Sequence, residues 1–267
     1  MKLFIILLLT GSISTSWYFF LHQKTHIRKI FIWIDNIIVI LLSTLFNYLT
    51  DSVFNHNSYL LHIVLSFVLV MGFSFTLIMY RFWRVPKRRV QVRPGEVLSP
   101  ADGNIIYIVK VEAGNIPVSI KNGLEAPLRE LMQTDIIAGP IWLIGINMTP
   151  FDVHVNSAPI SGKVVLNKHI PGKFLSLKNP LALVNNERNT LVIETDEGEF
   201  FGVVQTASKL VRRIDSYVKE GQRIKQGDWF GMIRFGSQVD MVLPYHYNLK
   251  VNIGQQVFAK TTTIAYK

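Results

Sequence analysis

Three apolar stretches near the N-terminus constrain the fold of this 267-residue chain more than any other feature. Leu3–Leu21 and Tyr59–Tyr80 contain no Lys, Arg, Asp or Glu, and Ile30–Leu49 contains only Asp35. A run of about 20 mostly apolar residues is long enough to cross a bilayer as a helix. The sequence therefore predicts three transmembrane spans, 3–21, 30–49 and 59–80, within an N-terminal membrane anchor of residues 1–90.

Two of these stretches admit another interpretation. Leu3–Leu9 is short and is followed by the small polar residues of Thr10–Ser16, a pattern that also fits a signal peptide cleaved near Ser16. The apolar run continues through Trp17–Leu21, which favours a retained span. Ile30–Leu49 is interrupted by polar residues, so it also fits a buried helix of a protein core.

Basic residues gather at the ends of the apolar stretches. Lys and Arg outnumber Asp and Glu by 28 to 18. Residues 22–29 and 81–89 are rich in Lys and Arg, whereas residues 50–58 contain neither. The positive-inside rule then places everything after Arg81 on the cytoplasmic side of the cell membrane, with an anionic membrane surface as a partner. No basic face with interleaved aromatics follows, so nucleic acid is not expected.

Residues 91–267 have a different pattern, typical of a mainly β domain. Short runs rich in Val, Ile and aromatics alternate with Gly, Pro, Asn and Asp, which predicts a barrel or sandwich. The predicted strands are Asn104–Lys110, Trp142–Asn147, Gly162–Leu166, Thr190–Thr195, Phe200–Gln205, Trp229–Phe235, Met241–Pro244 and Leu249–Ile253.

Turns at Pro100–Ile105, Pro159–Val164 and Glu220–Asp228 resemble those of lipoyl-type barrel-sandwich hybrids. The middle turn holds Ser161-Gly162-Lys163 rather than a carrier lysine in a modification hairpin, so neither biotin nor lipoate is inferred. The chain also has no cysteine, which excludes disulfides and cysteine-ligated metals, and no metal site is predicted.

The Gly236-Ser237 step at the end of a predicted strand suggests self-cleavage. Glycine leaves the peptide carbonyl unshielded, so the Ser237 hydroxyl can add to the Gly236 carbonyl and convert the amide to an ester. Elimination and loss of ammonia would then leave a pyruvoyl group at position 237. A serine needs an adjacent base, oriented by a third group, to act as a nucleophile.

His154 and Asp102 are the candidates for these two roles. In an extended segment Asp152, His154 and Asn156 share one face, which makes a polar face in an apolar domain. Asp102 precedes Gly103, as many turn aspartates do, and could orient a histidine if the fold brought it there.

Taken together, an ordered set of motifs resembles the phosphatidylserine decarboxylase proenzymes, most closely their short, archaeal-type form. The resemblance covers about residues 81–267. The motifs are Ser99–Gly103, Met148–Asn156, Pro171–Phe174, Asn186–Asn189, Val204–Ala207 with Arg212-Arg213, and Gly231–Ser237.

The resemblance implies an enzyme that cleaves itself between Gly236 and Ser237 into a membrane-anchored large chain and a small chain, which stay together as a heterodimer. Asp102, His154 and Ser237 match the family's processing triad by motif. Ser237 would become a covalent pyruvoyl cofactor, which acts as the electron sink for decarboxylation. The substrate would be the phospholipid phosphatidylserine, converted to phosphatidylethanolamine and carbon dioxide.

Several alternatives stay open. The substrate could be a related serine phospholipid such as archaetidylserine, and a higher oligomer is compatible with the sequence. Longer members of the family carry a second histidine where this chain has Ser157, so His154 could act in processing, in decarboxylation or in both. Other classes of protein that fit are a non-enzymatic carrier or assembly module and a serine hydrolase. Arg212, Arg213 and Lys173 are candidates for binding the lipid phosphate.

Overall fold

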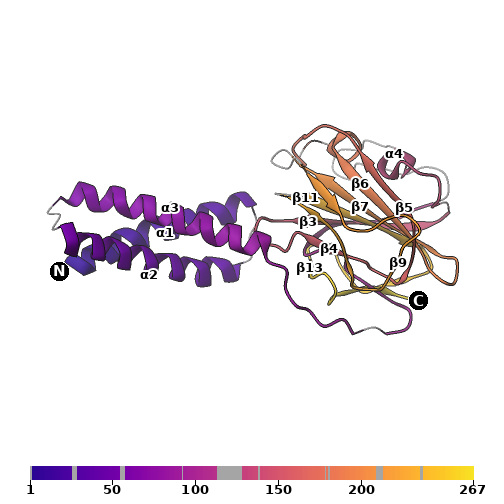
Figure 1. Cartoon of the computed structure of the whole chain (residues 1–267), viewed down its shortest axis with the longest axis horizontal. Helices are drawn as coiled ribbons and strands as arrows, with labels where there is room; N and C mark the ends of the chain where they lie inside the picture. Colours follow the sequence, from indigo (N-terminus) through magenta and orange to yellow (C-terminus); the bar gives the residue numbers. More distant parts are fainter. Residues whose placement is uncertain are drawn as a thin grey trace. The chain divides into compact units, whose positions relative to one another are not determined.

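The computed structural model describes residues 2–25, 29–54, 58–91, 93–112, 128–137, 139–177, 179, 181–208, 213–234 and 237–267. The chain divides into two compact units (Figure 1). One comprises Met1–Arg84 with Thr149–Phe151, and the other comprises Val85–Met148 with Asp152–Lys267.

Three helices make up most of the first unit: α1 (Lys2–Thr25), α2 (Lys29–Phe54) and α3 (Tyr59–Trp83). Each is long and apolar enough to cross a membrane, with mean hydropathy of 1.7 for 2–24, 2.0 for 29–54 and 2.3 for 59–83. Large apolar side chains such as Phe4, Trp33 and Phe75 are exposed, whereas Ser14, Asn47 and Ser66 are buried. This arrangement suits a bundle surrounded by lipid, because Ser14 binds Asn36, and Asn47 binds Ser66, between the helices.

Two carboxylates of this unit pair with basic groups of neighbouring helices. Arg81 of α3 makes a bidentate ion pair with the buried Asp35 of α2, in which Nε donates to Oδ2 at 2.6 Å. Asp51 of α2 lies 3.3 Å from Lys2 and 3.5 Å from His62. Burying the two carboxylates between the helices lets the outer surface stay apolar.

Eight antiparallel strands form the main sheet of the second unit, in the order β13-β2-β3-β11-β7-β6-β5-β9 (Figure 1). The sheet curls into a half-barrel. Its strands are β2 (Gly103–Val111), β3 (Ile141–Met148), β5 (Gly162–Ile170), β6 (Arg188–Glu194), β7 (Phe200–Ala207), β9 (Arg223–Ile224), β11 (Ser237–Pro244) and β13 (Gln256–Val257).

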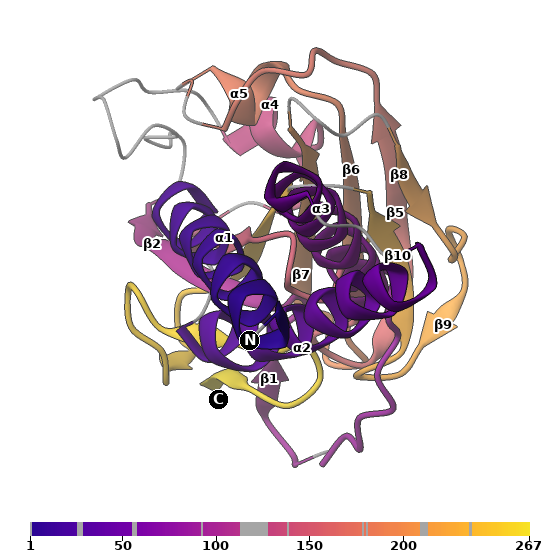
Figure 2. The ribbon, with the colours of Figure 1, turned by 90° about the vertical axis from the view of Figure 1, so that its left-hand side faces the viewer.

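Two three-stranded sheets accompany the main one, in the orders β1-β14-β12 and β4-β10-β8. Their strands are β1 (Glu96–Leu98), β4 (Val155–Ser157), β8 (Ile214–Ser216), β10 (Trp229–Ile233), β12 (Asn248–Leu249) and β14 (Thr263–Tyr266). Figure 2 shows the curled main sheet from another side. The fold is mainly β with N-terminal helices that could span a membrane, as the sequence predicted.

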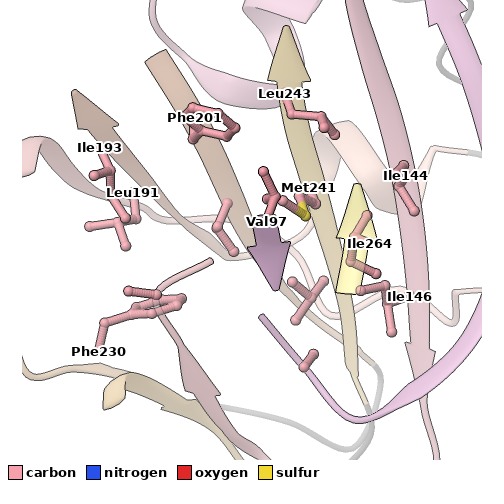
Figure 3. Close-up of a cluster of buried hydrophobic side chains, with 14 of the residues drawn as sticks. Val97, Ile144, Ile146, Leu191, Ile193, Phe201, Phe230, Met241, Leu243 and Ile264 are labelled. Atoms are coloured by element: carbon pink, nitrogen blue, oxygen red, sulfur yellow. The ribbon is translucent and has the colours of Figure 1, made fainter. Parts of the chain in front are cut away.

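The largest apolar core lies on one face of the main sheet. Alternate residues of its central strands, such as Ile146 of β3 and Met241 of β11, point to this face (Figure 3). Val97, Phe230 and Ile264 from the two small sheets complete the cluster. The small sheets thus cover one side of the half-barrel.

Short helices pack on the other face. Leu131 and Met132 of α4 (Leu128–Met132) share a second core cluster with Val204 and Val242, and Leu183 of α5 (Ala182–Asn185) packs against it.

Arg188 of β6 binds both short helices. Its buried guanidinium donates to the backbone carbonyl oxygens of Glu130, Leu131, Val184 and Asn186 at 2.6–2.9 Å. Carbonyl groups near the ends of α4 and α5 are therefore satisfied by one side chain from β6.

A strand overlaps each predicted range, but several strands begin or end at other residues than predicted. β11 begins at Ser237, four residues before the predicted Met241, and β10 ends at Ile233 rather than Phe235. The predicted strand Leu249–Ile253 was wrong beyond Leu249, where the chain turns. The strands β1, β4, β8, β9, β13 and β14 have two to four residues each and were missed, because so few residues show no alternation.

A buried carboxylate lies on the helix-covered side of β11. Asp240 accepts a short hydrogen bond from the Tyr107 hydroxyl and another from Gln238 Nε2 at 2.8 Å. Gly145 faces the Tyr107 ring, and a Cβ at this position would lie 2.3 Å from it, so glycine makes room for the ring. Burial raises the pKa of Asp240 from 3.8 to about 6, although both hydrogen bonds act to lower it.

We expect Asp240→Asn to remove a pH dependence of stability. Because the folded protein holds the Asp240 proton more tightly than the unfolded chain, wild-type stability falls as pH rises from about 4 through 6. The difference between 3.8 and about 6 corresponds to about 3 kcal/mol. Across pH 4–7, the melting temperature of the variant should rise relative to that of wild type as pH rises. Parallel profiles would contradict a raised Asp240 pKa.

Candidate active site

Ser237 is the first residue of β11, in the middle of the main sheet. Its backbone pairs with Met148 of β3 on one side and with Ala207 of β7 on the other. The predicted cleavage partner, Gly236, lies outside the described residues, as does Arg212. Position 237 is therefore anchored on both sides by central strands.

His154 is fully buried just before β4. Its Nδ1 lies 2.9 Å from the backbone carbonyl oxygen of Asp152. A carbonyl oxygen only accepts, so Nδ1 carries a hydrogen, and in the neutral ring the lone pair is then on Nε2. This is the tautomer that a general base requires, and the group that fixes it is a main-chain carbonyl.

Backbone pairing brings the His154 and Ser237 segments to the same end of the domain. The Ile233 N–H donates to the His154 carbonyl oxygen at 3.1 Å, and Met232 pairs with Val155. Four residues after Ile233, Ser237 pairs with Met148, six residues before His154. Both ends of the connection 234–236 are thus tied to the chain that carries the histidine.

Asp102 lies in the turn before β2, and its carboxylate is held by Arg88. Arg88 donates to Oδ1 at 2.5 Å and to Oδ2 at 2.7 Å, and it also donates to the Ala259 carbonyl oxygen at 3.0 Å. The Ala259 N–H donates to Asp102 Oδ1 at 2.8 Å. Among the described residues, the Asp102 carboxylate thus binds Arg88 and the Ala259 N–H, and these contacts do not include the His154 ring.

The same turn is nevertheless close to the His154 segment. The Ser157 N–H donates to the Pro100 carbonyl oxygen at 2.9 Å, and Gln256 Nε2 donates to Asp152 Oδ1 at 3.3 Å. Gln256 in turn pairs with Asn104, two residues after Asp102. The predicted role of Asp102 as the partner of His154 stays a prediction.

Arg88 was not recognised from the sequence as a partner of Asp102. It was assigned, with its basic neighbours after the third apolar stretch, to the lipid surface, whereas its charge pairs with a buried carboxylate. The only sequence signal was a basic residue near the Ser99–Gly103 motif, and a basic run next to a membrane span hides that signal.

The phosphate-binding candidates differ in their surroundings. Arg213 Nε lies 2.6 Å from Asp215, which also accepts from Arg234 at 2.9 Å. Partial burial disfavours the charged form of Asp215, but the hydrogen bonds from Arg234 and Arg213 outweigh it and lower the pKa of this carboxyl. The Arg213 charge is thus partly neutralised. Lys173 bridges to Asn186 through its backbone.

We expect Arg88→Gln to destabilise the β unit far more than Arg89→Gln. Removing Arg88 leaves a buried Asp102 carboxylate without its cation, which typically costs about 3–5 kcal/mol. Arg89 is the matched control, because it is exposed next to Arg88 in the chain. Melting of the purified variants in detergent measures both, and equal melting temperatures would show that the ion pair is dispensable.

Comparison with known proteins identifies the family of the chain. The phosphatidylserine decarboxylase family matches residues 75–265. A protein of Methanothermobacter thermautotrophicus named as an archaetidylserine decarboxylase proenzyme is 39% identical over 196 residues, 73% of this chain and 83% of that protein. Phosphatidylserine decarboxylase proenzymes of Cytophaga hutchinsonii and Azorhizobium caulinodans are 33% and 40% identical, over 74% and 69% of this chain and 81% and 71% of their own lengths. The chain belongs to the phosphatidylserine decarboxylase family.

Proposed function

We propose that this chain is the proenzyme of a membrane-anchored, pyruvoyl-dependent phosphatidylserine decarboxylase that cleaves itself between Gly236 and Ser237. The observation that carries the proposal is the position of Ser237, held between two central strands and reached from a strand that is bonded to the His154 backbone. Family membership and the names of the relatives support the same activity.

In the first step His154 Nε2 takes the proton of the Ser237 hydroxyl while Oγ attacks the Gly236 carbonyl carbon. The peptide C–N bond breaks, and its nitrogen takes a proton to become the free amine of residue 237, which leaves an ester. The buried imidazole, with its tautomer fixed by the Asp152 carbonyl, supports this role as general base. Asp102 is the proposed electrostatic partner of this centre.

In the second step residue 237 loses its Cα proton, and the Gly236 carboxylate leaves with the ester C–O bonding electrons. The dehydroalanine formed at position 237 tautomerises to an imine, and water replaces its nitrogen as ammonia. A pyruvoyl group then begins the small chain, 237–267, and supplies an electron sink for decarboxylation when it is present.

Strand pairing joins the two chains that the proposed cleavage would produce. The small chain would contribute β11, β12, β13 and β14. Of these, β11 pairs with β3 and β7 of the large chain, β13 with β2 and β14 with β1, while β12 pairs with β14. Side chains also join the two parts, through Tyr107 with Asp240 and Arg88 with the Ala259 carbonyl. These contacts support a heterodimer that keeps position 237 in place after cleavage.

In the decarboxylation itself, the chain must bind a lipid head group and supply a proton to the carbon that loses carbon dioxide. His154 is the proposed proton donor, because it lies beside the chain that leads to position 237. Residues 1–90 are the proposed anchor, and residues 91–267 form the proposed catalytic domain on the cytoplasmic side of an anionic membrane. The basic segment 81–89 supports this sidedness.

A second candidate substrate is archaetidylserine. Relatives of similar identity carry one or the other name, and both names denote a serine phospholipid. The residues around position 237 act on the serine head group, so the same chemistry serves either lipid.

Ser237→Ala tests the proposal. Wild type should give two masses in detergent, one of them the fragment 237–267 with an N-terminal carbonyl that an amine and a reductant convert to a heavier adduct. Ser237→Ala should remain one uncut chain without decarboxylase activity, because the attacking hydroxyl is gone. Ser161→Ala, at an exposed serine in another turn, serves as the control and should be cut. A cut Ser237→Ala chain, or an uncut folded wild type, would refute self-cleavage at this step.

A further inference from the structure

A chain of hydrogen-bonded amide side chains runs from the protein surface into the β unit. It links Asn167 of β5, Asn189 of β6, Gln205 of β7 and Asn156 of β4. Asn156, Asn189 and Gln205 are buried, on strands where apolar residues would ordinarily be expected. Two of them, Asn189 and Gln205, lie in sequence motifs to which no role was assigned.

The direction of every hydrogen bond in this chain is set at its outer end. Asn167 Nδ2 lies 2.7 Å from the Val218 backbone carbonyl oxygen, which can only accept, so Asn167 Oδ1 faces inward. Asn189 Nδ2 therefore donates to that oxygen at 3.0 Å, and it also donates to Gln205 Oε1 at 3.3 Å. Gln205 must then present Nε2 to the next member.

Asn156 is the inner end of the chain, and its orientation follows. Gln205 Nε2 donates to Asn156 Oδ1 at 2.8 Å, so the Asn156 Nδ2 group points elsewhere as a donor. Nδ2 is buried and has no hydrogen-bond partner among the residues that the structure describes. Buried donors without partners are uncommon and unfavourable in folded proteins, so this one calls for an acceptor that forms during function.

The location of Asn156 indicates which acceptor this is. Asn156 is two residues from His154 and pairs with Gly231, whose missing side chain admits the Gln205 amide: a Cβ there would lie 3.0 Å from Nε2. Gln205 pairs with Val239, while Ala207 pairs with Ser237. Gln205 and Ser237 are therefore diagonal neighbours on adjacent strands, and such residues typically lie about 7–8 Å apart.

We propose that Asn156 Nδ2 donates a hydrogen bond to the oxyanion that forms on the Gly236 carbonyl oxygen during self-cleavage. This inference rests on the proposed function. When Ser237 Oγ adds to the carbonyl carbon, the C=O π electrons move to the oxygen, and they return when the C–N bond breaks. Asn156 stabilises the charge between these two events and exchanges no atom or proton. Because Gln205 binds Asn156 Oδ1, the group that Asn156 has left to offer is a donor rather than an acceptor, as the stabilisation of an oxyanion requires.

Asn156→Asp is the main test, because it keeps the shape and Oδ1 but replaces the donor by an acceptor. The full-length chain is made by cell-free synthesis in the presence of lipid nanodiscs. The appearance of fragment 237–267 is then followed over time by mass spectrometry. Loss of one oxyanion donor typically slows a reaction by about 100–1,000-fold, and we expect cleavage to slow by that order. Gln205→Glu should also slow it with Asn156 intact, because Asn156 Nδ2 would turn to donate to the new carboxylate.

Thr190→Val is the matched control. Thr190 Oγ1 is also buried without a partner among the described residues. Successive side chains of a strand point to opposite faces, so the Thr190 side chain lies on the other face of β6 from Asn189. It should be cut at the wild-type rate. Asn156→Leu, which carries no amide at all, should be slow like Asn156→Asp and covers the case in which the aspartate variant does not fold. Melting temperatures confirm which variants are folded.

Hydroxylamine separates a role in ester formation from a general loss of structure near the site. It cleaves esters, so it should release no additional fragment from Asn156→Asp if the step that forms the ester is slow. Rapid release by hydroxylamine, or a folded Asn156→Asp or Asn156→Leu chain cut at the wild-type rate, would overturn the oxyanion role. If wild type itself stays uncut, the proposed function fails, which is a different result.

Discussion

The pairing of β11 with β3 and β7 is the constraint on which the β unit depends. This strand supplies Val239, Met241 and Leu243 to the larger core and Val242 to the smaller one. Its first residue is Ser237, so the same hydrogen bonds that stabilise the sheet fix the position of the proposed nucleophile. A shift of the register by one residue would exchange the two faces of the strand, which strongly specifies this pairing.

Polar side chains inside this domain each have a geometric task. Arg188 satisfies carbonyl groups of two short helices, Arg88 holds Asp102, and the amides of Asn189 and Gln205 orient Asn156. Burying such groups is favourable only when their hydrogen bonds are made. The amides of Asn189 and Gln205 act next to the segments that carry His154 and Ser237, because Asn156 is two residues from His154 and Gln205 is two residues from the partner of Ser237.

Much of the fold could be predicted from local pattern. The three apolar stretches predicted helices long enough to span a membrane, and β-branched runs located the main strands. The start of β11 was missed because Gln238 and Asp240 read as polar loop, whereas both are buried under the helices of the outer face. Partners of charged groups were beyond reach, since the Arg88 contact with Ala259 joins residues 171 positions apart. The motif resemblance named Asp102, His154 and Ser237, but only three-dimensional structure shows that a main-chain carbonyl fixes the His154 tautomer.

The small sheet β1-β14-β12 contains strands from both sides of the proposed cleavage site. Two of its three strands, together with β11 and β13, come after position 237. Before the proposed cleavage these strands find their partners within one molecule, at a high effective concentration. Afterwards, recovery from complete unfolding would be a bimolecular reaction whose yield depends on dilution. The uncut chain can therefore fold repeatedly, whereas the mature enzyme would persist through slow unfolding, so its lifetime would be kinetically determined.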